Sequence, residues 1–200
     1  SYGWASAMQQ ATVQLGKLGV QSIVNSMGVF VSAAFAAVNR IDDFAYMPQQ
    51  NIAHAMTALM AQNKGAKKTD RIKAAFRCGM KIEIFYGIFI FFVCFFFAHP
   101  LMQLFSNDPV VCKHGVTYLK LISLMYLFPA VTNGVQGYFR GIGDLKVTLI
   151  SSFVNMSVRM VFAAVLVFHF SLQIEALPFS YLAGWIGMLV AEVPLLLRKL

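Results

Sequence analysis

Polar and charged side chains recur at helical spacing in three hydrophobic segments of this sequence. At about 100° per residue, those of the first segment fall within an arc of about 80°; they are Gln10, Gln14, Lys17, Gln21 and Asn25. Two further stripes consist of Asn39, Asp43, Tyr46, Gln50, His54 and Thr57, and of Thr148, Ser152, Asn155 and Arg159. A stripe that mixes amides, a phenol, a carboxylate and cations is typical of the lining of a water-filled cavity. The stripes therefore indicate a pathway for a solute or an ion.

Polar faces also hold membrane helices together through hydrogen bonds of roughly 0.6 to 2 kcal/mol each, and this is the alternative interpretation. The charged residues favour the pathway. Arg40, Asp42 and Asp43 lie in one segment, and each would cost about 2.5 to 3.5 kcal/mol facing lipid at mid-bilayer. Arg40 and Asp43 are three residues apart and can pair on one helix. Lys17 or Arg159 could supply a second partner from another helix.

Asp43 is the carboxylate that the stripes favour as the proton-binding group. It lies near the middle of the second segment, whereas Asp42 is rotated off the stripe by about 100°. Desolvation and a nearby cation act on such a carboxylate in opposite directions, which is the balance that a proton-binding site needs. The residues that we expect to line the pathway are Gln14, Lys17, Gln21, Asn39, Asp43, Tyr46, Gln50, Asn155 and Arg159.

The composition identifies the elements that must position these side chains. The chain is 58% hydrophobic and 12% charged, with a mean hydropathy of +0.67, whereas charged residues make up about a quarter of a soluble domain. A membrane-spanning helix needs about 20 mostly apolar residues. That rule predicts an all-α membrane protein in which residues 1–200 form one unit of six transmembrane helices. The expected spans are 5–27, 30–62, 79–98, 116–138, 146–168 and 177–197. Pro48 and Pro129 each remove a backbone hydrogen bond and permit a kink within a span.

The positive charges are distributed unevenly about these spans. Seven of the sixteen cations fall in residues 62–81, which we treat as a loop after the second span. With Arg140, Lys146, Arg198 and Lys199, one side of the membrane receives eleven cations, and the opposite loops hold only Lys113. Lys and Arg near span ends stay in the cytoplasm. We therefore expect a multi-pass protein of the inner or plasma membrane with both ends of the segment in the cytoplasm, where the basic stretch also attracts anionic lipid.

Several other classes of function are excluded by the sequence. The net charge of +8 does not indicate nucleic-acid binding, because the cations fall between hydrophobic segments and no zinc-finger spacing is present. Cys78, Cys94 and Cys112 form no CxxC pair, and the spacing of the histidines specifies no metal site. No Walker, HExxH or GxSxG motif occurs, so neither ATP-driven pumping nor hydrolysis is predicted. We expect no enzymatic activity, no cofactor and no metal.

An even number of spans inserts a duplicated unit the same way up, which gives parallel repeats about an axis along the membrane normal. The sequence shows no internal repeat. It also begins without Met in a stretch that already has a helical pattern. We therefore expect the chain to be part of a longer protein that contains the partner repeat.

Three stretches are similar to the carboxy-terminal six-helix lobe of the MATE family of multidrug and toxic compound extrusion transporters. They are QNKGAKK after the second span, LFSNDPVV in the loop after the third, and YFRGIGDLK between the fourth and fifth. The resemblance covers nearly the whole chain. It implies one of two six-helix lobes with a cleft between them, in a secondary-active antiporter that exports drugs or organic cations in exchange for H⁺ or Na⁺.

One departure from the family pattern concerns the coupling ion. The sodium-coupled branch is expected to carry acidic residues in the first and fourth helices of this lobe, but residues 5–27 and 116–138 contain none. The resemblance then implies that coupling uses the acid pair of the second span or lies in the amino-terminal lobe. Two alternatives stay open. A lipid-linked oligosaccharide flippase of the same superfamily would use the cations Lys17, Arg40 and Arg159, and a non-transporting scaffold would bury the stripes.

Overall fold

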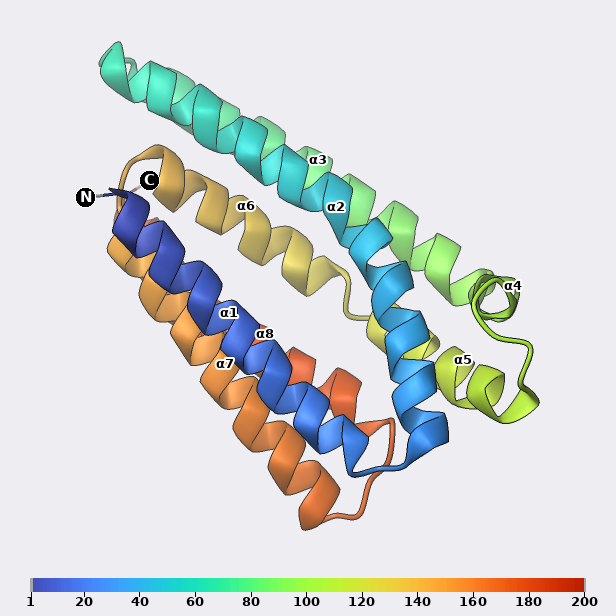
Figure 1. Cartoon of the computed structure of the whole chain (residues 1–200). Helices are drawn as coiled ribbons and strands as arrows, with labels where there is room; N and C mark the ends of the chain where they lie inside the picture. The colour runs from blue at the N-terminus through green and yellow to red at the C-terminus, as the bar shows by residue number, and fades with distance from the viewer. Residues whose placement is uncertain (1, 200) are drawn as a thin grey trace.

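The computed structural model describes residues 2–199, apart from the side chains at positions 2, 3, 5, 6 and 10, so the Gln10 side chain of the first stripe lies outside the description. This part of the chain forms α-helices and no strands (Figure 1). The helices are α1 (Tyr2–Asn25), α2 (Val29–Gly65), α3 (Thr69–Phe96), α4 (Ala98–Gln103), α5 (Pro109–Ser123), α6 (Leu127–Gly141), α7 (Leu145–Phe168) and α8 (Ala176–Leu197). The chain is therefore all-α, as its hydropathy pattern predicts.

The basic stretch is mostly helical, which corrects its treatment as a loop. α2 continues to Gly65, only a short turn follows, and α3 begins at Thr69, ten residues before the expected span at 79. A hydropathy window detects the apolar part of a helix and misses a charged extension of it. The extension is stabilised by Asp70 in the first turn of α3, where a negative charge interacts favourably with the helix dipole.

The expected fourth span, 116–138, is not one continuous helix. It corresponds to α5 and α6, which are separated by a break at residues 124–126 and bent by 52° relative to each other. Pro129 lies in the first turn of α6, a position where its missing N–H costs no helical hydrogen bond, whereas in mid-helix it would break one. The proline therefore favours a new helix start rather than a kink within a single helix.

α2 contains Pro48 but stays helical throughout. Figure 1 shows that it changes direction partway along its length. A proline in a helix interior removes one backbone hydrogen bond and clashes with the preceding turn, which bends the helix. Pro48 accounts for the bend.

Three helices in the described part of the chain, α3, α7 and α8, are long and apolar enough to cross a membrane, and α5 with α6 would make a fourth, bent span. α1 and α2 have 24 and 37 residues; even 24 residues extend about 36 Å at 1.5 Å per residue, more than the roughly 30 Å of a hydrocarbon core. α1 and α2 are therefore long enough to cross a membrane, and it is their polar stripes that make them less apolar than α3, α7 and α8.

The helices pack as two connected groups. α1, α7 and α8 lie together, α2 and α3 form a long pair beside them, and α6 packs against both groups (Figure 1). One hydrophobic cluster joins α2 to α5 and α8 through buried side chains that include Phe35, Tyr118 and Leu177. A second joins α2, α3 and α6 around Met56, Phe76 and Phe139. The outward faces of α3 carry exposed phenylalanines, namely Phe85, Phe89, Phe92 and Phe96.

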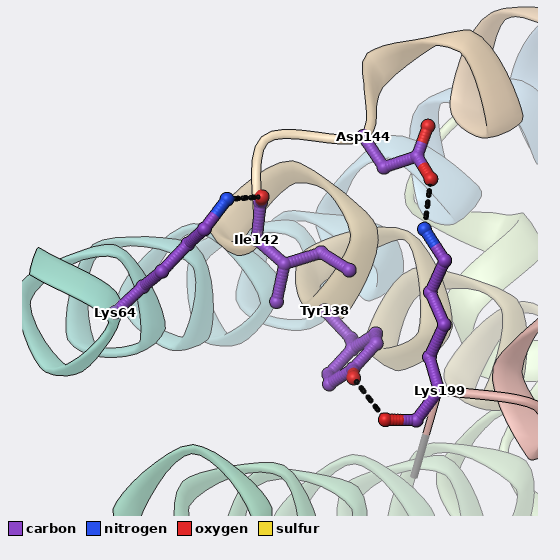
Figure 2. A network of polar contacts seen from close by, with 5 residues as sticks. All are labelled: Lys64, Tyr138, Ile142, Asp144 and Lys199. Atoms are coloured by element: carbon purple, nitrogen blue, oxygen red, sulfur yellow. Dashed lines mark hydrogen bonds and ion pairs between the residues drawn. The ribbon is translucent and has the colours of Figure 1, made fainter. Parts of the chain in front are cut away.

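The basic segments meet at one end of the bundle. Lys64, next to the α2–α3 turn, donates a hydrogen bond to the carbonyl oxygen of Ile142 in the α6–α7 connection. Lys199, after α8, pairs with Asp144 of the same connection, and its carbonyl oxygen accepts a hydrogen bond from Tyr138 (Figure 2). The cation-rich segments that charge asymmetry assigns to one side of a membrane are thus neighbours in space.

Candidate functional site

Asp42 of α2 is a carboxylate in the interior of the bundle, with an exposed fraction of 4%. Tyr126 donates a hydrogen bond from its phenol to Oδ1 of Asp42 over 2.5 Å. Tyr126 lies in the break between α5 and α6, so the break is the element that delivers this donor to α2. The Tyr46 ring packs edge-on against Tyr126, with ring centroids 5.5 Å apart.

Arg159 of α7 approaches the same region from the opposite group of helices. Its guanidinium carbon lies 3.1 Å from the centroid of the Tyr181 ring on α8, a stacking that suits a planar cation. It is near enough to Asp42 for the two charges to attract each other. Gly184 permits the approach of α7 to α8, because a Cβ there would lie 2.9 Å from Oδ1 of Asn155 and 3.2 Å from Cβ of Arg159.

Several polar atoms around this pair lack a partner within the described residues. They are the hydroxyl oxygens of Tyr46 and Tyr118 and the Nε atom of Arg159, all buried. Tyr118 of α5 packs on Tyr181, with ring centroids 6.5 Å apart. Buried polar groups are normally hydrogen-bonded, and groups that are not require a specific explanation. We refer to Asp42, Tyr46, Tyr118, Tyr126, Arg159 and Tyr181 as the Asp42 cluster.

The Asp42 cluster contains chemical groups that suit a small cation. A carboxylate and phenolic oxygens accept a proton or coordinate a hard monovalent cation, and the aromatic faces favour a cation as well. Arg159 makes no ion pair with Asp42 among residues 2–199, so no cation of the described chain is bound directly to that carboxylate.

The first two polar stripes lie mainly on the outside of the described bundle. On α1, Gln14 and Lys17 are exposed and Gln21 is half-buried. On α2, Asp43 and Gln50 are exposed, whereas Asn39 and Tyr46 are half-buried. Arg40 is also exposed, and it makes no ion pair with Asp43, since Lys199–Asp144 is the one ion pair among residues 2–199. The structure thus separates Asp43, on the surface, from Asp42, in the interior.

The third stripe, on α7, faces inward and takes part in hydrogen bonds between helices. Gln9 of α1 donates to Oγ of Ser152 over 2.8 Å, and Gln136 of α6 donates to the same oxygen over 3.2 Å. Ser151 donates to the fully buried Glu192 of α8 over 2.5 Å. These contacts match the alternative interpretation, in which a polar face holds helices together. Asn155 and Arg159 lie farther along the same face, beside the Asp42 cluster.

Tyr118, Tyr126 and Tyr181 of the Asp42 cluster were missed by sequence reasoning, which considered Asp42 only as half of an acid pair and favoured Asp43. One signal was available for Asp42. The residues on the same face of the helix as Asp42 are small and apolar, such as Ala34, Val38 and Ala45. Apolar residues at this spacing mark the face of α2 that packs against the other helices. An acid on that face must be buried.

The MatE family model matches residues 5–165 of this chain. The chain belongs to the MatE family. Its members are transporters rather than enzymes, and they are multi-pass membrane proteins. The match confirms the family that the loop motifs resemble, and with it the expectation that the protein is not an enzyme. The expected all-α fold is confirmed by the helices of the structure.

Curated MatE relatives are longer than this chain. The chain is 24% identical over 188 residues to the probable multidrug resistance protein NorM of Thermotoga maritima, covering 94% of the chain and 39% of that relative. It is 27% identical over 186 residues to the probable multidrug resistance protein YoeA of Bacillus subtilis, covering 92% of the chain and 39% of that relative. The chain thus spans about two-fifths of the length of each.

A solved structure of the outward-facing conformation of a multidrug resistance MATE family transporter of the MOP superfamily has the same fold. The TM-score is 0.90 at 18% identity, covering 98% of this chain and 45% of that one. The arrangement of helices described above is therefore a MATE arrangement, present here over somewhat less than half of such a transporter.

Proposed function

We propose that the intact protein is a secondary-active antiporter that exports drugs or organic cations in exchange for protons or sodium ions. Residues 1–200 form its carboxy-terminal six-helix lobe, and the rest of the transporter supplies an amino-terminal lobe. No organic cofactor takes part. The names of the NorM and YoeA relatives, both multidrug resistance proteins, support the export of drugs.

The observation that carries the proposal is the buried Asp42, hydrogen-bonded to Tyr126 and attracted by Arg159. Ionisable residues within membrane helices are expensive, and they mark ion and proton pathways. Asp42 therefore takes the ion-binding role that sequence reasoning gave to Asp43. Asp43 keeps a role as a residue that lines the solute pathway.

The exposed polar side chains of α1 and α2 support a cleft between two lobes. Lys17, Asp43 and Gln50 project from the lobe surface, where a lipid environment would be costly for them. The phenylalanines exposed on α3 suit lipid instead. A lobe with one polar and one apolar exterior fits a position between a substrate pathway and the bilayer.

The cation-rich end of the bundle supports an orientation. The end of α2, next to the α2–α3 turn, and the end of α8 both contact the α6–α7 connection there. Because Lys and Arg near span ends stay in the cytoplasm, this end faces the cytoplasm. The membrane is the inner or plasma membrane of the cell.

A lipid-linked oligosaccharide flippase is the second candidate, and Lys17 and Arg40 favour it because both are exposed. A cleft with these cations would attract a pyrophosphate group. The third candidate, a scaffold that does not transport, fits poorly with charged side chains on the lobe surface. Substrate assays separate the first two candidates, and the accessibility of cysteines at positions 17 and 43 separates both from the scaffold.

The experiment uses the intact protein in vesicles loaded with a fluorescent cationic dye. An inwardly directed proton or sodium gradient is imposed, and dye export is followed. We expect one of the two gradients to drive export against the dye gradient. If neither gradient drives export while a fluorescent lipid-linked oligosaccharide is translocated, the flippase replaces the antiporter.

A further inference from the structure

A second buried polar group lies in the lobe, apart from the Asp42 cluster. Glu83 of α3 and Gln49 of α2 both have an exposed fraction of 0%. Both carboxylate oxygens of Glu83 and both amide atoms of Gln49 lack a hydrogen-bond partner within the described residues. Four buried side-chain atoms without a partner is an unusual concentration, since nearly all such atoms in folded proteins are paired.

The contacts between α2 and α3 put Glu83 and Gln49 at the same level. On one side of them, Tyr86 donates a hydrogen bond to the carbonyl oxygen of Ala45. On the other side, Gly79 packs against Met56, where an added Cβ would lie 2.3 Å from its sulfur. The two helices are antiparallel, so Glu83, between Gly79 and Tyr86, faces the turn of α2 that carries Gln49.

A third helix packs on α3 at this level. Gly87 of α3 packs against Ala130 of α6, and Gly134 of α6 packs against Met80 of α3. Ala130 and Gly134 are four residues apart and share one face of α6, so at this level α6 presents nonpolar groups to α3.

The side chains near Glu83 supply no neutralising charge. The titratable or charged groups nearest in register to Glu83 come from α3 and from the helices packed on it. They are Lys81 and Tyr86 on α3, Tyr46 and His54 on α2, His99 on α4, Lys120 on α5, and Tyr126 and Arg140 on α6. The cations among them are exposed, except for Arg140, which donates to Gln136. Tyr86 and Tyr126 donate elsewhere. A buried carboxylate without a partner cannot stay there as a free anion, because the cost of desolvation is far too large.

We propose that Glu83 and Gln49 form a second binding site for a monovalent cation, taken up either as a proton on the Glu83 carboxylate or as a sodium ion among the side-chain oxygens. In the first case the proton adds to one carboxylate oxygen, and the remaining oxygen and Gln49 complete the hydrogen bonds. In the second case the carboxylate and the amide oxygen act as ligands, and oxygen atoms are what hard cations prefer.

This site is distinct from the Asp42 cluster and does not depend on the proposed export activity. Gln49 follows Asp42 by seven residues, which is about 10 Å along α2, toward the cation-rich end. Pro48 lies between the two sites, next to Gln49 in the sequence. The two sites therefore lie one after the other along the bundle, on either side of the bend in α2.

The test measures binding directly in the purified intact protein, without transport. The proton is detected by the infrared band of a protonated carboxyl group in sodium-free buffer. Sodium is detected as the increase in melting temperature in sodium chloride relative to choline chloride, because a ligand that binds only the folded state stabilises it. Glu83→Gln and Gln49→Leu are compared with Asp70→Asn, which removes an exposed acid from the first turn of the same helix. All are made in an Asp42→Asn background, so that the Asp42 cluster contributes neither a carboxyl band nor a response to sodium.

If the ligand is a proton, Glu83→Gln removes one protonated-carboxyl band that Asp70→Asn retains. If it is sodium, Gln49→Leu weakens sodium binding by about tenfold or more, the cost expected for losing one contact to a charged group, and Glu83→Gln abolishes it. A Glu83→Gln protein that retains both the band and the response to sodium would overturn the proposal. If that variant does not fold, Gln49→Leu decides, because a proton site predicts a shifted band and a sodium site predicts weaker binding. A Gln49→Leu protein that shows neither of these changes would overturn the proposal.

Discussion

Tyr126 is the residue whose hydroxyl makes an interior position tolerable for Asp42. A hydrogen bond to a charged group contributes more than one between neutral groups, and its loss leaves a buried acceptor unpaired. Arg159 attracts Asp42 without a hydrogen bond in the described structure. Among the described residues, Tyr126 is thus the one hydrogen-bond partner of the carboxylate.

We expect Tyr126→Phe to lower the free energy of unfolding by about 1 to 3 kcal/mol, the cost of an unsatisfied buried polar group. Thermal unfolding of the purified intact protein measures the change. Tyr86→Phe is a matched control, since it removes a phenol that donates to the neutral carbonyl oxygen of Ala45, and its effect should be about 0.5 to 1.5 kcal/mol. Equal stabilities of Tyr126→Phe and the unaltered protein would contradict the role assigned to this hydroxyl.

At this scale the sequence predicts where polar groups lie on a helix but not which way that helix faces. The stripe through Asp43, Tyr46 and Gln50 is real, yet it runs along the edge of the exposed face of α2. The orientation depends on the partners of the helix, and these include α5 and α6, which lie far from α2 in the sequence. Asp42 and Tyr126 meet only through that packing.

At the scale of elements, α6 is the helix that connects the two groups, and its glycines allow it to approach α2 closely. A Cβ on Gly137 would lie 2.9 Å from the carbonyl oxygen of Ala53, and one on Gly141 would lie 3.0 Å from that of Thr57. Thr57 also donates a hydrogen bond to the carbonyl oxygen of Gly137 over 3.1 Å. Backbone atoms cannot move aside as a flexible side chain can.

Gly137→Val should therefore destabilise the protein by roughly 1 to 3 kcal/mol, as overpacking does in other cores. The yield of monodisperse protein after detergent extraction and its melting temperature report the effect. Gly65→Ala is the control, because nothing lies within 4 Å of a Cβ at the end of α2. A Gly137→Val protein as stable as the Gly65→Ala protein would show that α2 and α6 are not closely packed.

The expected spans each lie on a helix or a pair of helices, because long apolar runs and intervening turn residues are strong local signals. The break between α5 and α6 and the early start of α3 were not predicted. Pro129 is compatible with either a kink or a new helix, and only the packing of Tyr126 against α2 distinguishes the two. The charged first turns of α3 give no hydropathy signal.

At the scale of the whole molecule, the contacts at the cation-rich end fix which segments must share one side of a membrane. Lys64, Ile142, Asp144 and Lys199 come from three different parts of the chain and meet there (Figure 2). Asn107, in the connection between α4 and α5, lies at the other end of α3. The topology can therefore be tested with three positions.

In a cysteine-free form of the intact protein, cysteines introduced at positions 68 and 144 should be labelled by an impermeant reagent only from the cytoplasmic side. A cysteine at position 107 should be labelled from outside. The expected pattern follows from the positive-inside rule. Labelling of positions 68 and 144 from outside, with position 107 protected, would reverse the orientation.

The ion-exchange role of Asp42 is tested most directly by dye efflux per molecule of correctly inserted protein, measured for Asp42→Asn and Asp43→Asn in the intact transporter. We expect Asp42→Asn to abolish efflux coupled to the ion gradient, because an amide keeps the shape of the side chain but cannot exchange a proton or hold a cation against Arg159. Asp43→Asn, on the exposed face, should have the milder effect. Normal specific efflux in Asp42→Asn, with less folded protein in the membrane, would contradict the account and leave Asp42 as a structural partner of Arg159 and Tyr126.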